Sequence, residues 1–126
     1  LLGTATIMPM VNQIRLHPAE QQKDVSAYSR KLGMLLEAYS PLGTGALLRQ
    51  PEIVSCAEKY GRSPAQICLR WNLSKGFLPL PKSVTPARIR QNAQLFDFEL
   101  APEDIALLDT LEGRLGYSNH PDHIDF

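Results

Sequence analysis

The sequence predicts an α/β fold whose strands run parallel and are joined by helical crossovers. Three short apolar segments alternate with segments of helical pattern in the order β-α-β-α-α-β-α-α, which is typical of parallel sheets. The 126 residues are 44% hydrophobic and 21% charged, as in an ordinary globular protein. No internal repeat, low-complexity tract or linker divides the sequence. Three strands would make either a small open sheet or a piece of a closed barrel, in one domain or part of one.

The first two elements are predicted to be a strand and a helix. Residues 8–16 (MPMVNQIRL) have the character of a strand. Residues 20–32 follow a helical pattern, because Val25, Tyr28 and Leu32 share one apolar face.

A second strand is predicted at residues 34–39, followed by a loop rich in proline and glycine and a helix at residues 52–60. The clearest helix signal comes next. Ser63 is a favourable N-cap, Pro64 occupies the first helical position and Gln66 the third, and together they form a capping box.

The remaining elements are a strand and two helices. The strand is predicted at residues 77–80, and a helix begins at Thr85-Pro86 and runs to about residue 94. The last helix is predicted from residue 102 to a stop at Gly113, and a polar tail at residues 114–126 follows it.

Composition indicates which classes of partner to expect. Lys plus Arg equals Asp plus Glu, at 13 each, so no excess charge indicates nucleic acid or a membrane surface. The apolar runs are far shorter than the ~20 residues that a membrane span needs. No signal peptide is recognisable, and Cys56 and Cys68 fall in helical patterns. We therefore expect reduced thiols in a cytoplasmic protein.

A local basic segment stands out in this neutral chain. Between residues 76 and 96 the charged residues are Lys82, Arg88 and Arg90, so this segment carries +3 and the rest of the chain −3. A local concentration of positive charge in a neutral protein suggests a bound anion.

The same segment lies where a phosphate could bind, because residues 81–88 (PKSVTPAR) follow a strand and open a helix. Ligands of parallel α/β folds bind at the carboxyl ends of strands, and a helix start attracts phosphate. Arg88 and Arg90 are expected to oppose the helix dipole, a penalty that a bound phosphate would reverse. Alternatively, these residues are solvated surface charges.

Two further segments carry polar or aromatic groups at or near strand ends. In AYSPLG, Tyr39 could offer its ring face to a flat ligand, while Pro41 and Gly43 would let the backbone approach closely. Alternatively, Tyr39 is a rim residue that covers the core. Asn12 and Gln13 are amides inside an apolar strand, and they need hydrogen-bond partners from a ligand amide or from the sheet.

The histidines are weaker candidates. His17 lies at a strand end, but no acid or nucleophile is patterned with it, so we expect a structural role. His120 and His123, with Asp122 and Asp125, resemble a metal cluster only loosely and are expected to belong to a solvated tail. The sequence therefore predicts no metal site.

Considered together, the segments VNQIRLHP, AYSPLG, GRSPAQICLRW, LPKSVTPARIRQN and FDFEL resemble the aldo-keto reductase family in order and spacing. The resemblance runs from about residue 5 to 113. It implies the C-terminal portion of a (β/α)8 TIM barrel, with the three strands as barrel strands six to eight and residues 1–126 in one domain. The segments TGALLRQPEI and SNHPDHIDF resemble the bacterial and protist branch near diketogluconate reductases.

The family binds NADPH, and the resemblance implies which residues would hold it. Gln13 would hydrogen-bond the nicotinamide carboxamide, Tyr39 would stack on the nicotinamide ring, and residues 40–43 would line the pyrophosphate. The full set implied to bind NADP(H) is Gln13, Tyr39, Ser40, Pro41, Leu42, Gly43, Lys82, Ser83, Val84, Arg88, Gln91 and Asn92.

At the adenosine end, Lys82, Ser83 and Arg88 would hold the 2′-phosphate of the ribose. Gln91 and Asn92 would contact adenine. Gln91 stands where the family more often has Glu, which is a departure from the family pattern.

The implied activity is reduction of an aldehyde or ketone by hydride transfer from NADPH to the carbonyl carbon. The family's catalytic Asp, Tyr, Lys and His lie on earlier strands, and this chain has no counterpart of them. We therefore expect the chain to be the cofactor-binding half, dependent on the N-terminal half of the barrel and inactive alone. The alternatives are a non-catalytic NADP(H)-binding module, as in the potassium-channel beta subunits, and a truncated pseudo-enzyme.

Overall fold

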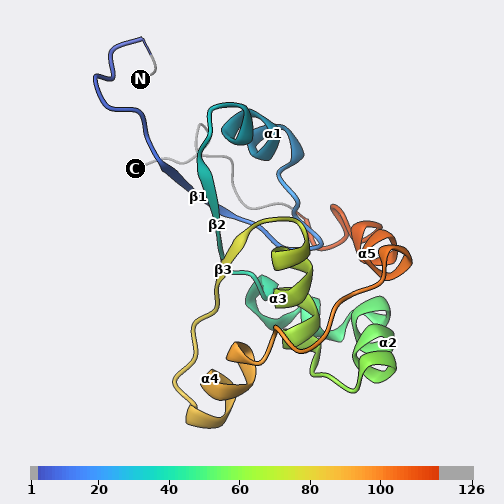
Figure 1. The fold of residues 1–126 in the computed structure, drawn as a ribbon. Helices are drawn as coiled ribbons and strands as arrows, with labels where there is room; N and C mark the ends of the chain where they lie inside the picture. Colours follow the sequence, from blue (N-terminus) through green and yellow to red (C-terminus); the bar gives the residue numbers. More distant parts are fainter. Residues whose placement is uncertain (1–2, 117–126) are drawn as a thin grey trace.

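The computed structural model describes residues 3–116, which form a three-stranded parallel sheet with helices around it (Figure 1). The strands are β1 (Val11–Arg15), β2 (Leu35–Tyr39) and β3 (Leu78–Leu80), adjacent in that order. The helices are α1 (Lys23–Lys31), α2 (Pro51–Tyr60), α3 (Pro64–Ser74), α4 (Pro86–Ala93) and α5 (Pro102–Asp109). Two short 3-10 segments, Gly43–Gly45 and Leu47–Arg49, follow β2. The predicted order of strands and helices is confirmed.

The two faces of the sheet differ in what covers them. Leu36 and Ala38 on β2 are buried on the face that packs against the helices. The opposite face carries the odd-numbered residues of β1 and β2 and, because Glu37 and Tyr39 pair with Leu78 and Leu80, the even-numbered residues of β3. In Figure 1 the helices α1, α2, α3 and α5 gather to one side of the three strands. The apolar side chains of the opposite face are between 41% and 49% exposed: Val11, Leu35, Tyr39, Leu78 and Leu80.

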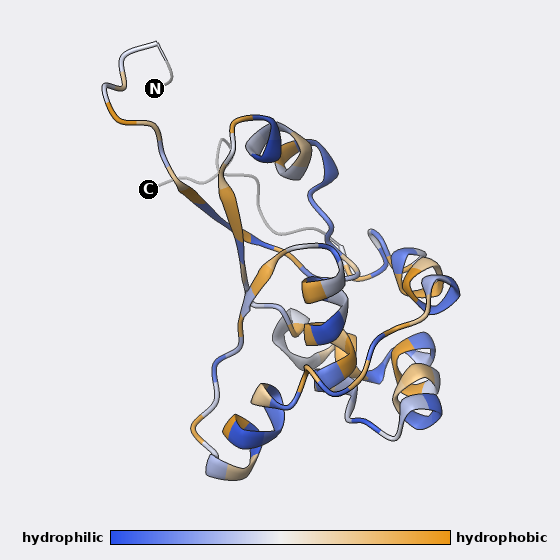
Figure 2. Cartoon of the chain, in the orientation of Figure 1, coloured by the Kyte–Doolittle hydropathy of each residue, from blue (hydrophilic) through white to orange (hydrophobic). Residues whose placement is uncertain are grey.

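The uncovered face is unusual for a parallel sheet, which is normally covered on both sides. Figure 2 shows apolar residues along β1 and β2 themselves. Within residues 3–116 no helix covers the face that carries these exposed side chains, so this face is available to pack against further polypeptide. We refer to it as the open face.

The core lies between the sheet and helices α2, α3 and α5. Ile67 and Trp71 of α3 are fully buried, and the Trp71 indole donates a hydrogen bond to Asp109 (2.8 Å) at the end of α5. The capping box at the start of α3 is confirmed. The Ser63 hydroxyl accepts a hydrogen bond from the backbone N–H of Gln66, and the Gln66 side-chain oxygen accepts one from the backbone N–H of Ser63.

Helix α1 corrects the sequence prediction of its buried face. Val25 and Tyr28 are 40% and 56% exposed and Leu32 is half-buried, whereas Ser26 and Ser29 are buried. The predicted apolar face is therefore wrong, because small side chains let α1 lie close to the sheet. The helix also starts later than predicted, since Gln22 adopts left-handed backbone angles.

Several element ends are shorter than predicted. The first strand covers Val11–Arg15 of the predicted 8–16, and α5 ends at Asp109, with turns continuing towards Gly113. Cys56 and Cys68 are buried and unpaired, and burial raises the pKa of both thiols. No helix within residues 3–116 is long and apolar enough to cross a bilayer. The candidates in the tail, His120, Asp122, His123 and Asp125, lie outside the described residues.

Candidate functional site

The segments that follow β2 and β3 meet at one edge of the sheet. These strands are parallel neighbours, and their last residues, Tyr39 and Leu80, are paired in register. Two adjoining hollows of about 380 and 390 Å³ lie at this edge and share Leu42, Leu48 and Lys82 as lining residues. We call the two hollows together the β2–β3 groove. It runs from the loop after β2 to the exposed side of α4.

The loop after β2 approaches the groove through an unusual backbone. Ser40 and Thr44 have φ values of 48° and 54°, and Gly43, which is buried, has φ 54°. A Cβ atom on Gly43 would lie 2.9 Å from the Cβ of Leu47, so a side chain does not fit there. Ser40, Pro41 and Leu42 line the groove, while Gly43 lies beneath them, and the loop brings backbone close to any occupant.

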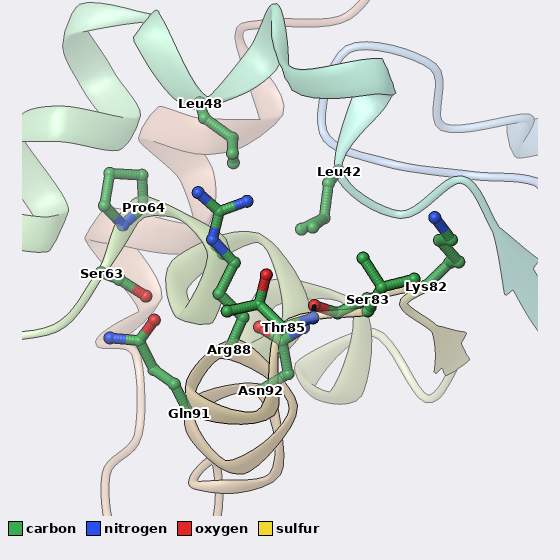
Figure 3. Close-up of a pocket in the computed structure, with 12 residues that line it drawn as sticks. Leu42, Leu48, Ser63, Pro64, Lys82, Ser83, Thr85, Arg88, Gln91 and Asn92 are labelled. Carbon is green, nitrogen blue, oxygen red and sulfur yellow. Dashed lines mark hydrogen bonds between the residues drawn. The ribbon is translucent and has the colours of Figure 1, made fainter.

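The start of α4 forms the other side of the groove and carries positive charge. Lys82 and Arg88 are exposed, and neither forms an ion pair within the described part of the chain. The Ser83 hydroxyl accepts a hydrogen bond from Thr85 N (3.2 Å), and Thr85 provides no side-chain cap for the helix. Figure 3 shows the Arg88 side chain reaching from α4 towards Leu48. An anion here would find two cations beside a helix start.

Arg90 corrects the prediction that two arginines oppose the dipole of this helix. Helix α4 has only eight residues, so Arg88 lies in its first turn and Arg90 in its last, where a cation is favourable. Arg90 is exposed and is not among the residues that line the groove. The basic segment therefore divides into Lys82 and Arg88 at the groove and Arg90 away from it.

Gln91, Asn92 and Val84 also line the groove, which brings the adenosine-end residues named from the sequence together. Gln66, which the sequence indicated only as part of the capping box of α3, also holds the helix α4 that carries these residues. The side chain of Gln66 donates from Nε2 to the backbone oxygens of Gln91 (3.1 Å) and Gln94 (2.9 Å). One buried amide thus completes the cap of α3 and ties the end of α4 to it.

Other lining residues were also missed by sequence reasoning. Residues 63–65 at the start of α3 lie far from residues 81–92 in the sequence and meet them only through the fold. The capping signal at Ser63 could have indicated a helix start near the site. The missed lining residues are Thr44, Gly45, Leu48, Ser63, Pro64, Ala65 and Leu80, whereas Pro81 and Thr85 belong to the segment 81–88 that the sequence indicated.

Gln13 and Tyr39 lie outside the groove, on the open face of the sheet. Tyr39 ends β2 and leads directly into the groove at Ser40. The Gln13 side chain donates from Nε2 to a carboxylate oxygen of Glu37 at 2.9 Å. Asn12 points to the other face, where its amide donates to the Ser29 hydroxyl (3.0 Å), which is the structural partner that the sequence left open.

His17 is buried beneath the loop after β2 and has a structural position. It is 1% exposed, and burial lowers its pKa to about 4, partly opposed by Glu20, whose carboxylate lies 3.8 Å from Nε2. A Cβ on Gly43 would lie 3.5 Å from His17 Nε2, so the ring packs directly under that glycine. The neutral imidazole therefore supports the loop from below.

Solved structures define the class of fold to which this arrangement belongs. A mutant of Gox0644, determined in complex with NADPH, aligns with a TM-score of 0.93 and 34% identity over 99% of this chain and 46% of that chain. MGS-M4, an aldo-keto reductase enzyme from a deep-sea metagenome library, aligns with a TM-score of 0.93 and 33% identity over 100% of this chain and 48% of its own. The three strands and their helices are thus a portion of a TIM barrel.

The sequence comparisons identify the family. The model of the aldo/keto reductase family matches residues 2–112, and the chain belongs to this family. The oxidoreductase YtbE of Bacillus subtilis (strain 168) is 42% identical over all of this chain and 45% of its own length. Glyoxal reductase of the same organism is 43% identical over all of this chain and 46% of its length. The chain spans about half the length of the curated relatives that it matches.

Proposed function

We propose that the complete protein reduces aldehydes or ketones to alcohols with NADPH and that this chain supplies the cofactor-binding half. The observation that carries the proposal is the β2–β3 groove, with Lys82 and Arg88 exposed beside the start of α4. A relative is named glyoxal reductase, and a similar structure is a complex with NADPH, which supports both the reaction class and the cofactor.

The adenosine end of NADPH fits the α4 side of the groove. Its 2′-phosphate would accept paired hydrogen bonds from the Arg88 guanidinium and a point charge from Lys82. Ser83 would add a hydroxyl, and the first-turn N–H groups of α4 would add their partial positive charge. Gln91 and Asn92 would contact the adenine ring.

The pyrophosphate and nicotinamide fit the β2 side. Ser40, Pro41 and Leu42 would line the pyrophosphate, and Gly43, where a side chain would collide with Leu47, would let the loop pack closely enough to hold them there. Tyr39 would offer its ring face to the nicotinamide, and Gln13 would hydrogen-bond the carboxamide.

When bound, NADPH supplies a hydride to the carbonyl carbon of the substrate. The residues of this chain orient the nicotinamide ring from one side and hold the phosphates, which fixes the distance between ring and substrate. The proton donor is expected in the N-terminal half, together with the family's Asp, Lys and His. In this scheme the present chain binds and positions the cofactor, and the N-terminal half carries out proton transfer.

The open face supports this division of labour. Its exposed apolar side chains would lie in the barrel interior once five more strands close the sheet, and closure would also remove the free edges of β1 and β3. The buried, unpaired Cys56 and Cys68 support a reducing compartment, and we propose the cytoplasm.

The test is an assay of the full-length protein with a panel of aldehydes, following oxidation of NADPH and of NADH separately. We expect aldehyde-dependent oxidation with a strong preference for NADPH. Tight NADPH binding without turnover would replace the proposal by a non-catalytic NADP(H)-binding module. Equal use of NADH would remove the 2′-phosphate assignment.

A further inference from the structure

Gln13 has a neighbour that determines which of its atoms can face a ligand. Gln13 of β1 and Glu37 of β2 are register partners, and their side chains share the open face. Gln13 Nε2 donates a hydrogen bond to Glu37 Oε2 at 2.9 Å. An ionised carboxylate only accepts hydrogen bonds, so it can pair with the –NH2 end of the amide and not with its oxygen. The contact therefore fixes the orientation of the Gln13 amide.

This orientation has a consequence for recognition. One N–H of Gln13 Nε2 is donated to Glu37, which leaves the carbonyl oxygen, Oε1, as the acceptor that Gln13 can present to a ligand on the side away from Glu37. An acceptor of this kind selects a ligand that offers a hydrogen-bond donor. The carboxamide of nicotinamide offers such a donor in its –NH2 group, whereas a ring substituent with only a carbonyl does not.

We propose that Glu37 is a positioning residue that orients Gln13 to recognise the carboxamide –NH2 group of the nicotinamide. The proposal deepens the proposed function and rests on it, because it requires that Gln13 contact the nicotinamide. Glu37 itself does not contact the cofactor in this scheme. It lies two residues before Tyr39 on β2, so Tyr39 is about 6–7 Å closer to the carboxyl end of the sheet, where the ring would stack.

The other charged residue on this face of β1, Arg15, is paired elsewhere, so Glu37 is the charged group that contacts Gln13. Arg15 is also on the odd-numbered side of β1, but its side chain lies 3.2 Å from the carboxylate of Glu20. Glu37 is half-buried and Gln13 is exposed in this chain, and closure of the proposed barrel would shield their hydrogen bond from water and strengthen it. Gln13 and Glu37 are separated by 24 positions in the sequence, and only the strand register brings them together.

The experiment compares two oxidised cofactors that differ at one substituent. NADP+ carries the carboxamide, and 3-acetylpyridine adenine dinucleotide phosphate carries a methyl ketone, which has no donor. The full-length protein is titrated with each by calorimetry, and the ratio of the two Kd values is compared among wild type, Glu37→Leu, Glu37→Gln, Gln13→Leu and, as a matched control on the same face, Leu35→Val. Because the ratio is taken within one variant, any general change in folding or charge affects both cofactors and cancels.

We expect wild type to bind NADP+ about two- to tenfold more tightly than the analogue, the range for one hydrogen bond. Glu37→Leu and Gln13→Leu should bring the ratio close to one. Glu37→Gln, whose amide can pair with either end of Gln13, should lower it, and Leu35→Val should leave it unchanged.

The outcomes separate the two levels of the proposal. A ratio that survives Glu37→Leu and Glu37→Gln but is lost in Gln13→Leu overturns the role of Glu37 and leaves the Gln13 contact standing. A ratio that survives Gln13→Leu as well overturns the nicotinamide assignment of Gln13, and the role of Glu37 with it. Loss of the ratio in Leu35→Val would show that the open face responds to any substitution, which also overturns the specific role.

Discussion

Replacing Arg88 by alanine should change cofactor preference more than any other single substitution at the groove. Arg88 is exposed, lies in the first turn of α4 and forms no ion pair within residues 3–116, so its removal breaks no salt bridge there. It also removes a mild conflict with the helix dipole. The expected effect is therefore confined to the bound phosphate.

The magnitude follows from the type of contact. A charge-assisted hydrogen bond contributes roughly 1.5–3 kcal/mol, so Arg88→Ala should weaken NADPH by about ten- to a hundredfold. NADH lacks the 2′-phosphate, and its affinity should change by no more than about twofold, as for an ordinary surface substitution.

Arg90→Ala is the matched control because it removes the same charge from the same helix at an exposed position away from the groove. Both variants are titrated with NADPH and NADH in the full-length protein at one fixed salt concentration, since screening weakens such contacts. Equal weakening of both cofactors by Arg88→Ala would refute the phosphate assignment. An equal loss of NADPH affinity in Arg90→Ala would show that the local field matters rather than a direct contact.

Three other predictions concern the Tyr39 ring, the buried His17 imidazole, and the activity and stability of these 126 residues expressed alone. Tyr39→Phe should be tolerated and Tyr39→Ala should cost on the order of 1 kcal/mol in cofactor binding; equal damage by both in a Kd titration would show that the hydroxyl matters. The pKa of His17 is lowered to about 4, so the unfolded state takes up the proton first and stability should fall as pH drops from 6.5 towards 4, by about 3 kcal/mol in all. Urea unfolding of wild type and His17→Gln at several pH values measures this as a difference in slope, and identical slopes contradict it. These 126 residues expressed alone should show neither aldehyde reduction nor a cooperative thermal transition as a monomer, because the apolar side chains of the open face remain exposed to water. Either observation would show that the chain is self-sufficient.

Local sequence signals predicted the elements well where side chains close in the sequence form hydrogen bonds with the backbone of the same element. The capping box at Ser63 and Gln66 defined the start of α3, because every group involved lies within one helical turn. The apolar pattern of Val25 and Tyr28 predicted the wrong buried side for α1. The buried side is decided by how closely the helix approaches the sheet, and a sequence pattern does not contain that distance.

The site was predicted in its parts but not in its connections. The loop after β2 depends on left-handed backbone angles at Ser40 and Thr44, which local preference disfavours and only the surrounding packing can impose. The contact between Gln13 and Glu37 depends on strand register. The tether from Gln66 to α4 depends on the packing of two helices. Each of these features depends on the fold as a whole. The two contacts join residues 24 and 25 positions apart in the sequence, too far for a local pattern to indicate them.

Helix α4 has no buried residue, and besides its packing against α3 the side-chain hydrogen bonds at its two ends within residues 3–116 involve Ser83 before its start and the Gln66 amide at its end. Such a helix can open locally at small free-energy cost, so its backbone amides should exchange with deuterium far faster than those of α3. A dinucleotide that binds only the ordered helix would slow that exchange by mass action. Because Gln66 belongs to α3 and holds the end of α4, the slowing should extend into the first turn of α3, and the reach of cofactor binding into the core could be followed amide by amide.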